Sequence, residues 1–279
     1  MPAKPKVILF DIGGVCVVSP MSAIAQYERT NSIPANYINH AISASGTHGA
    51  WARLERGEIS LDNTFFSAFK ADLCSESVWR AHWTKHIQKT KNIPAGQSAE
   101  ESIYNCPPVP DIDAERLYWE MMSVSRAPDP HIYPALKKLR AHADKTGEFI
   151  VAACSNTSIF PADHPFSDPD TTEGRFNKEL KSNFELFVSS AHVGMRKPNR
   201  DIYEYTVREL DQLAKQKWGP DKGVSAQDIV FLDDIGANLK AARAVGMRTI
   251  KVIMGKTDAA VKELEKVTSI TLRGERSRL

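Results

Sequence analysis

The side chains best suited to chemistry in this sequence are a few carboxylates, a hydroxyl, an amide and a lysine. They belong to Asp11, Ser155, Asn156, Lys197, Asp233 and Asp234. A carboxylate can attack phosphorus only when the charge of the phosphoryl group is neutralised and its geometry is held. Mg²⁺ is commonly bound by one or two carboxylates, a hydroxyl can donate to a phosphoryl oxygen, and a lysine supplies positive charge. The set therefore predicts a magnesium-dependent site for a phosphorylated small molecule.

Short apolar segments precede most of these polar residues. They cover residues 7–10, 149–154, 229–232 and 249–253. None alternates cleanly with polar residues, which is typical of strands buried on both faces of a parallel sheet. Segments with a helical pattern separate them, at residues 134–143, 200–217 and 236–244. This alternation predicts a doubly wound, Rossmann-like α/β domain, in which ligands bind beyond the carboxyl ends of the strands.

Residues 21–127 have a different pattern. Apolar and aromatic residues recur there at helical intervals, for example Leu61, Phe65 and Phe69, and no buried strand is evident. We therefore expect an inserted α-helical cap domain at 21–127, and a core domain made of residues 1–20 and 128–279. Residues 160–177 are dense in Pro, Asp and Thr and are expected to form a surface loop.

The charge and composition of the chain indicate which classes of binding partner to expect. The 279 residues carry a net charge of +2, too mild to favour nucleic acid or an anionic membrane as a partner. No run of eighteen apolar residues occurs, so we expect no segment that spans a membrane. The four cysteines form no CxxC pair and are expected to be free thiols in a reducing compartment. The expectation is a soluble, cytoplasmic protein.

Four sequence motifs in order resemble those of the haloacid dehalogenase superfamily. The sequence FLDDIGANLKAARAVGM closely resembles the fourth motif of the subgroup that includes the N-terminal phosphatase domain of soluble epoxide hydrolases. SSAHVGMRKPNRDIYEY resembles that subgroup's third motif, ACSNTS its second, and FDIGGV its first with one change. Residues 51–59 are similar to a stretch found in the helical caps of this subgroup. Each motif alone would be weak, but four in order are specific.

The resemblance implies roles for the matching residues on the substrate side. Asp11 would be the nucleophile that forms a phospho-aspartate. Lys197 would stabilise charge on both Asp11 and the phosphate. Ser155 and Asn156 would hold the transferring phosphoryl group, next to the backbone of Gly14.

The resemblance also implies a metal site and one missing group. Asp11, Asp234 and the backbone carbonyl of Gly13 would bind Mg²⁺, and Asp233 would contact it through water or orient its ligands. Most phosphatases of the superfamily carry a second aspartate where Gly13 stands, as general acid and base. A glycine at position 13 predicts slower turnover, a preference for substrates with good leaving groups, or another side chain, such as His48, that donates the proton to the leaving group.

Other functions remain open at this stage. A 2-haloacid dehalogenase also uses a strand-end aspartate and lacks the second one, but its fourth motif lacks the acidic pair seen at Asp233 and Asp234. A non-catalytic protein that binds a phosphorylated ligand has Gly13 as its only support. A phosphotransferase is a further option, because slow hydrolysis would lengthen the life of a phospho-enzyme. The acidic pair could also cap the helix that begins near Gly236.

Overall fold

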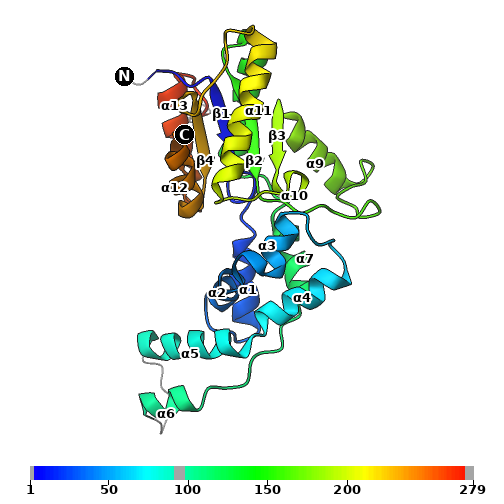
Figure 1. Cartoon of the computed structure of the whole chain (residues 1–279), viewed down its shortest axis with the longest axis vertical. Coiled ribbons are helices and arrows are strands. Elements are labelled where there is room, and N and C mark those ends of the chain that lie inside the picture. Colours follow the sequence, from blue (N-terminus) through cyan, green and yellow to red (C-terminus); the bar gives the residue numbers. More distant parts are fainter. Residues whose placement is uncertain (1–2, 91–97, 274–279) are drawn as a thin grey trace, which may run out of the picture. The chain divides into compact units, whose positions relative to one another are not determined.

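The structure is a computed structural model that describes residues 3–90 and 98–273. The chain divides into two compact units (Figure 1). Unit 1 consists of Met1–Ser19, Glu55–Gly57 and Ser125–Leu279, and unit 2 of Pro20–Leu54 and Glu58–Val124. Glu55–Gly57, inside the predicted cap, belong to unit 1, and the division into a core of residues 1–20 and 128–279 and a cap at 21–127 stays a prediction. None of the helices in the described ranges is long and apolar enough to cross a membrane.

Unit 1 contains a five-stranded sheet in the order β3-β2-β1-β4-β5 (Figure 1). The strands are β1 (Val7–Phe10), β2 (Ile150–Ser155), β3 (Leu186–Ser189), β4 (Ile229–Asp233) and β5 (Arg248–Lys251). All neighbouring pairs are parallel. The carboxyl ends of the strands therefore lie at one edge of the sheet, which is where the polar residues were expected to meet.

Helices cover both faces of this sheet, as predicted. They are α8 (Ile132–Thr146), α9 (Thr172–Ser182), α10 (Ser190–Val193), α11 (Arg200–Trp218), α12 (Gly236–Val245) and α13 (Thr257–Thr268), with a short 3-10 helix η2 (Ala226–Asp228) before β4. Ile8 and Phe10 of β1 belong to a buried cluster with residues of α8 and α13. Val7 and Leu9 belong to a second cluster with residues of α11 and α12. Alternate side chains of one strand thus enter opposite cores, which explains the continuous apolar run.

Two parts of unit 1 differ from the expectations. Strand β3, which pairs with β2 at the edge of the sheet, was not predicted from the sequence. The loop expected at residues 160–177 ends at Thr171, because α9 begins at Thr172. The side chain of Thr171 accepts a hydrogen bond from the backbone of Gly174 and so caps this helix.

Unit 2 is helical in the described residues, as the periodicity predicted. Its helices are α1 (Met21–Thr30), α2 (Tyr37–Ala44), the 3-10 helix η1 (Gly46–His48), α3 (Ala50–Glu55, whose last residue belongs to unit 1), α4 (Asn63–Leu73), α5 (Glu76–Thr90), α6 (Ala99–Tyr104) and α7 (Ala114–Val124). An aromatic cluster holds α4 to α7: the ring centroids of Phe65 and Phe69 lie 5.3 Å apart, and those of Phe65 and Tyr118 lie 5.5 Å apart. These three side chains are fully buried, and each contributes about 1.5–3 kcal/mol through burial.

Candidate active site at the carboxyl edge of the sheet

Asp11 follows the last residue of β1 and lies at the centre of the predicted site. Its backbone N–H donates to the carbonyl of Leu232 on the neighbouring strand β4 (2.9 Å). Its side chain is 8 % exposed, and Oδ1 accepts a hydrogen bond from the backbone of Ile12 (2.7 Å). The carboxylate is therefore fixed by the end of the strand and the turn that follows, while a part of it remains accessible.

The turn after Asp11 depends on Gly14. Its φ of +76° is in the left-handed region that favours glycine. A Cβ atom at this position would lie only 2.2 Å from Oδ2 of Asp234. Gly14 therefore allows the loop after β1 to approach the carboxylate of Asp234. Contact of Gly14 with a substrate, and of the Gly13 carbonyl with a metal, stay predictions.

Lys197 joins two of the predicted carboxylates. Its Nζ lies 2.9 Å from Oδ2 of Asp11 and 2.7 Å from Oδ2 of Asp233, and its side chain is fully buried. Burial opposes the positive charge, but the Asp11 and Asp233 carboxylates outweigh it and hold the pKa of Lys197 above its ordinary range. Lys197 is thus a permanently charged group beside the candidate nucleophile.

Ser155 and Asn156, at the end of β2, are placed differently from each other. Oγ of Ser155 donates to Oδ1 of Asp11 (2.7 Å), so this hydroxyl lies directly at the carboxylate. The amide of Asn156 instead binds the peptide groups of Lys197. Its Oδ1 accepts from the Lys197 N–H (2.8 Å), and its Nδ2 donates to the Lys197 carbonyl (3.0 Å). A direct contact of the Asn156 side chain with substrate stays a prediction.

The two adjacent acids after β4 have different surroundings. Asp233 is fully buried, and besides Lys197 it accepts hydrogen bonds from the backbone of Ile235 (2.7 Å) and from Nδ2 of Asn238 (3.1 Å). The N-cap residue of α12 is Ile235, without a side-chain cap hydrogen bond, so neither acid is the N-cap residue that the capping alternative proposed. Oδ1 of Asp234 is buried and has no hydrogen-bond partner among the described residues.

The acidic cluster has the donor chemistry of a Mg²⁺ site. One carboxylate oxygen from each of Asp11, Asp233 and Asp234 lies within 4.8 Å of the other two. Burial, together with the charges of Asp11 and Asp233, raises the pKa of Asp234 to about 7. A cation would offset this repulsion and would satisfy the unpartnered oxygen of Asp234. Hard oxygen donors of this kind suit Mg²⁺.

Some residues around the site were missed in the sequence analysis. Glu55 accepts hydrogen bonds from Asn156 and Arg196, and Asn238 donates to both oxygens of Asp233. Asn238 lies five residues after Asp233 in the first part of α12, so its proximity could have been inferred from the strand–helix pattern. No local signal links Glu55 to Arg196. His48, named as an alternative proton donor, is exposed and belongs to unit 2.

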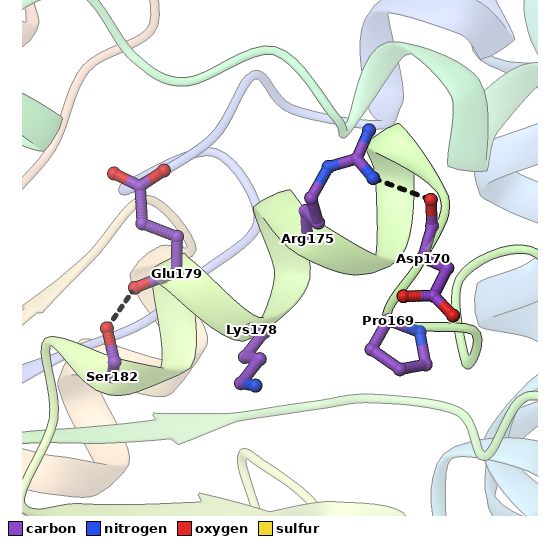
Figure 2. Close-up of a pocket in the computed structure, with 6 residues that line it drawn as sticks. All are labelled: Pro169, Asp170, Arg175, Lys178, Glu179 and Ser182. Carbon is purple, nitrogen blue, oxygen red and sulfur yellow. Dashed lines mark hydrogen bonds between the residues drawn. The ribbon is translucent and has the colours of Figure 1, made fainter.

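A separate surface pocket of about 630 Å³ lies along α9 and the loop before it (Figure 2). Its lining residues are Pro169, Asp170, Arg175, Lys178, Glu179 and Ser182. Arg175 donates to the backbone carbonyl of Asp170 (2.6 Å), and Ser182 donates to the backbone carbonyl of Glu179 (2.7 Å). These polar groups are satisfied by the backbone of α9 and its preceding loop, and none of the predicted site residues lines the pocket.

The chain resembles parts of several known proteins. It is 27 % identical to bifunctional epoxide hydrolase 2 of Sus scrofa over 265 residues, which are 95 % of this chain and 39 % of that protein. It is 41 % identical to the Rattus norvegicus protein of the same name over 90 residues, 32 % of this chain and 14 % of the relative. A third relative is the sesquiterpene phosphatase astK of Aspergillus oryzae, 34 % identical over 73 residues, 25 % of this chain and 31 % of that protein. The chain thus spans less than two fifths of the length of these curated relatives.

Solved structures share the fold. A HAD-like family hydrolase from Porphyromonas gingivalis matches 94 % of this chain and 98 % of its own, with a TM-score of 0.50 and 18 % identity. A dehalogenase in an intermediate complex matches 97 % of this chain and 100 % of its own, with a TM-score of 0.52 and 14 % identity. At these identities the likeness concerns the fold. No model of a protein family matches the chain. The chain thus shares its fold with a HAD-like family hydrolase and a dehalogenase, and it is similar in sequence to part of epoxide hydrolase 2.

Proposed function

We propose that this protein is a magnesium-dependent phosphatase that hydrolyses a small phosphorylated metabolite through an aspartyl-phosphate on Asp11. The observation that carries the proposal is the cluster of three carboxylates, Asp11, Asp233 and Asp234, within 4.8 Å of one another beside the buried ammonium of Lys197. A nucleophilic carboxylate, a fixed positive charge and a set of hard oxygen donors are the parts that phosphoryl transfer requires. The sesquiterpene phosphatase among the relatives supports the same class of reaction.

In this mechanism a carboxylate oxygen of Asp11 attacks phosphorus, and the bond from phosphorus to the leaving-group oxygen breaks. Ser155 Oγ and Lys197 Nζ, which both contact Asp11, would hold the transferring group and stabilise its charge. Water then attacks phosphorus, which releases inorganic phosphate and regenerates the Asp11 carboxylate. Asp11, Asp234 and the Gly13 carbonyl would hold Mg²⁺, and Asp233 would contact it through water or orient its ligands. When bound, the ion would supply Lewis-acid charge at the phosphoryl oxygens.

Gly13 bears on the choice of substrate. The leaving group must take up a proton as the bond breaks, and Gly13 has no side chain to donate one. A positioned acid–base group typically contributes about 10²–10⁴-fold, so esters of weakly basic leaving groups, such as sugar-1-phosphates or acyl phosphates, should react best.

Two further features belong to the proposal. We propose that residues 21–127 act as the cap that covers the site and selects the substrate. All four cysteines, Cys16, Cys74, Cys106 and Cys154, are free thiols, which supports a reducing compartment such as the cytoplasm.

Hydrolysis of para-nitrophenyl phosphate tests the proposal directly. The full chain is assayed with Mg²⁺, with EDTA, and as Asp11→Asn. Asp228→Asn serves as a matched control, because Asp228 precedes β4 at the opposite edge of the sheet. Turnover that requires both Mg²⁺ and Asp11, and that survives Asp228→Asn, is the expected result.

The other outcomes separate the alternatives. Folded protein without phosphatase turnover, but with metal-independent release of halide from a 2-haloacid, would indicate a dehalogenase. Inactivity in both assays, with phosphate binding retained, would indicate a non-catalytic protein. Transfer of the phosphoryl group to an added alcohol faster than to water would indicate a phosphotransferase.

A further inference from the structure

Glu55 lies at the end of α3 but belongs to unit 1, together with Arg56 and Gly57. Its Oε2 accepts hydrogen bonds from Nε of Arg196 (2.6 Å) and from Nδ2 of Asn156 (3.3 Å), and Nη2 of Arg196 also lies 2.5 Å away. The Glu55 and Arg196 side chains are only 12 % and 21 % exposed. This is a largely buried ion pair in which one carboxylate oxygen receives three donors.

The segment Glu55–Gly57 packs closely against the backbone of α10 within unit 1. Gly57 has a φ of +67°, and a Cβ atom there would lie 2.3 Å from the backbone carbonyl oxygen of Ala191. A side chain at this position would therefore push the segment away from α10. Glu55 is thus anchored from two directions, by its ion pair and by the backbone contact two residues later.

Arg196 and Asn156 are each adjacent in sequence to a residue that contacts Asp11. Arg196 precedes Lys197, and Asn156 follows Ser155. The Asn156 amide also hydrogen-bonds the N–H and the carbonyl of Lys197, at 2.8 and 3.0 Å. Through these two side chains, Glu55 is therefore linked to the backbone segments that carry Lys197 and Ser155. Nζ of Lys197 and Oγ of Ser155 extend from these segments to the candidate nucleophile.

We propose that Glu55 is a positioning residue for catalysis, which fixes Lys197 and Ser155 through Arg196 and Asn156. This inference rests on the proposed phosphatase function and adds a residue that none of the four motifs contains. Glu55 would act through the side chains of Arg196 and Asn156, with which it forms hydrogen bonds. Its effect follows from geometry, because misplacement of a catalytic group by about 1 Å can cost 10²-fold in rate.

The alternative is that Glu55 contributes only to folding. A structural role would lower the stability of the protein but leave kcat per folded molecule unchanged. A positioning role would lower kcat in folded protein and leave KM nearly constant, because orientation matters most in the transition state. These two roles are separable by measuring kcat, KM and the folded fraction of the same preparations.

The test uses para-nitrophenyl phosphate and Mg²⁺ with the full chain and the variants Glu55→Gln, Glu55→Ala and Arg196→Gln. Glu185→Gln is the matched control. Glu185 is similarly buried (14 % exposed) and pairs with Lys217 and Arg140, but it precedes β3 at the amino edge of the sheet. Folded fractions are measured by circular dichroism.

We expect Glu55→Ala to lower kcat about 10- to 100-fold, as is typical for residues that orient catalytic groups, with KM changed less than about threefold. Glu55→Gln keeps a hydrogen-bond acceptor and should lie between wild type and Glu55→Ala. Because Glu55 and Arg196 act as one unit, the Glu55→Ala/Arg196→Gln double variant should lose little more than the worse single variant.

Three results would overturn the inference: a kcat of folded Glu55→Ala within threefold of wild type, an equal loss in Glu185→Gln, or fully additive losses in the double variant. An inactive wild-type protein would instead refute the proposed function, and this inference with it. The wild-type measurement therefore distinguishes the two failures.

Discussion

Removal of the charge on Asp234 should stabilise the metal-free protein and abolish its stabilisation by Mg²⁺. Asp234 lies next to Asp11 and Asp233 in the carboxylate cluster, and its Oδ1 is buried without a hydrogen-bond partner among the described residues. Asp234→Asn keeps the size of the side chain and removes the negative charge. The repulsion among the carboxylates then falls, while an oxygen ligand of the proposed metal site loses its charge.

The size of the effect follows from the pKa of Asp234, which burial and the neighbouring acids raise from 3.8 to about 7. Each pKa unit corresponds to about 1.4 kcal/mol, so the shift of about 3 units sets a ceiling of about 4 kcal/mol. Solvent reaches a part of this side chain and screens the charges, so we expect about 2 kcal/mol. Between pH 4 and pH 7 the folded protein binds more protons at Asp234 than the unfolded chain does. The stability of the metal-free wild type therefore falls as the pH rises through this window.

Urea unfolding in EDTA and in Mg²⁺ measures both effects. At pH 8 in EDTA, Asp234→Asn should have the larger free energy of unfolding, and its advantage should shrink as the pH falls toward 4. Mg²⁺ at about 100 times its Kd should add about 2.7 kcal/mol to the wild type and much less to the variant.

Asp228→Asn is the matched control for this experiment. Although burial opposes it, hydrogen bonds from Ser225 and the charge of Lys6 hold the pKa of Asp228 below its ordinary value. This variant should therefore lose stability above pH 4 and respond to Mg²⁺ like the wild type. Two results would contradict this prediction. One is an Asp234→Asn protein that is less stable than the wild type in EDTA. The other is a variant whose free energy of unfolding rises with Mg²⁺ as much as that of the wild type.

Three further predictions concern the same site. Lys197→Met leaves Asp11 and Asp233 buried without their cation, so urea unfolding should show that the free energy of unfolding falls by about 3–5 kcal/mol. Turnover of para-nitrophenyl phosphate should also disappear. A free energy of unfolding close to that of the wild type would count against the buried ion pair. Ser155→Ala removes the donor to Asp11 and should lower kcat about 10²-fold in steady-state kinetics, whereas an unchanged kcat would exclude Ser155 from the transition state. Because Gly13 offers no general acid, kcat should fall steeply as the leaving-group pKa rises across a series of aryl phosphates, by up to about 10²–10⁴-fold; a flat dependence would reveal another proton donor.

The central part of the fold could be predicted because burial leaves a clear pattern in the sequence. Strands β1, β2 and β4 are buried throughout, so each is a continuous apolar run. Strand β3 lies at the edge of the sheet, and most of its side chains are only partly buried, so no such run marks it. Helix α9 was partly assigned to a loop because its first turn follows a segment rich in Pro, Asp and Thr. In both cases tertiary packing, rather than local pattern, decides the structure.

The candidate site could be predicted as far as strand ends determine it. Asp11, Ser155 and Asp233 end or follow three neighbouring parallel strands, and this alone brings them together. The contacts of Asn156 with Lys197 and of Glu55 with Arg196 join residues 41 and 141 positions apart. They depend on how the loops fold over the edge of the sheet, and no spacing rule encodes that. Side-chain types thus predicted the chemistry, while the groups that orient those side chains required the structure.

The charge balance of the site gives a physical reason to expect a cation in substrate binding as well as in chemistry. Three carboxylates, Asp11, Asp233 and Asp234, face one ammonium, that of Lys197, so the cluster has two negative charges in excess when all are ionised. A phosphate monoester brings nearly two more, because its second pKa is about 6. A pair of like charges 4 Å apart costs about 4 kcal/mol at an effective dielectric constant of 20. A 2-haloacid is also an anion and would meet the same repulsion. A divalent cation would neutralise this excess of carboxylates, so we expect the ion to favour the binding of a phosphate monoester as well as its reaction.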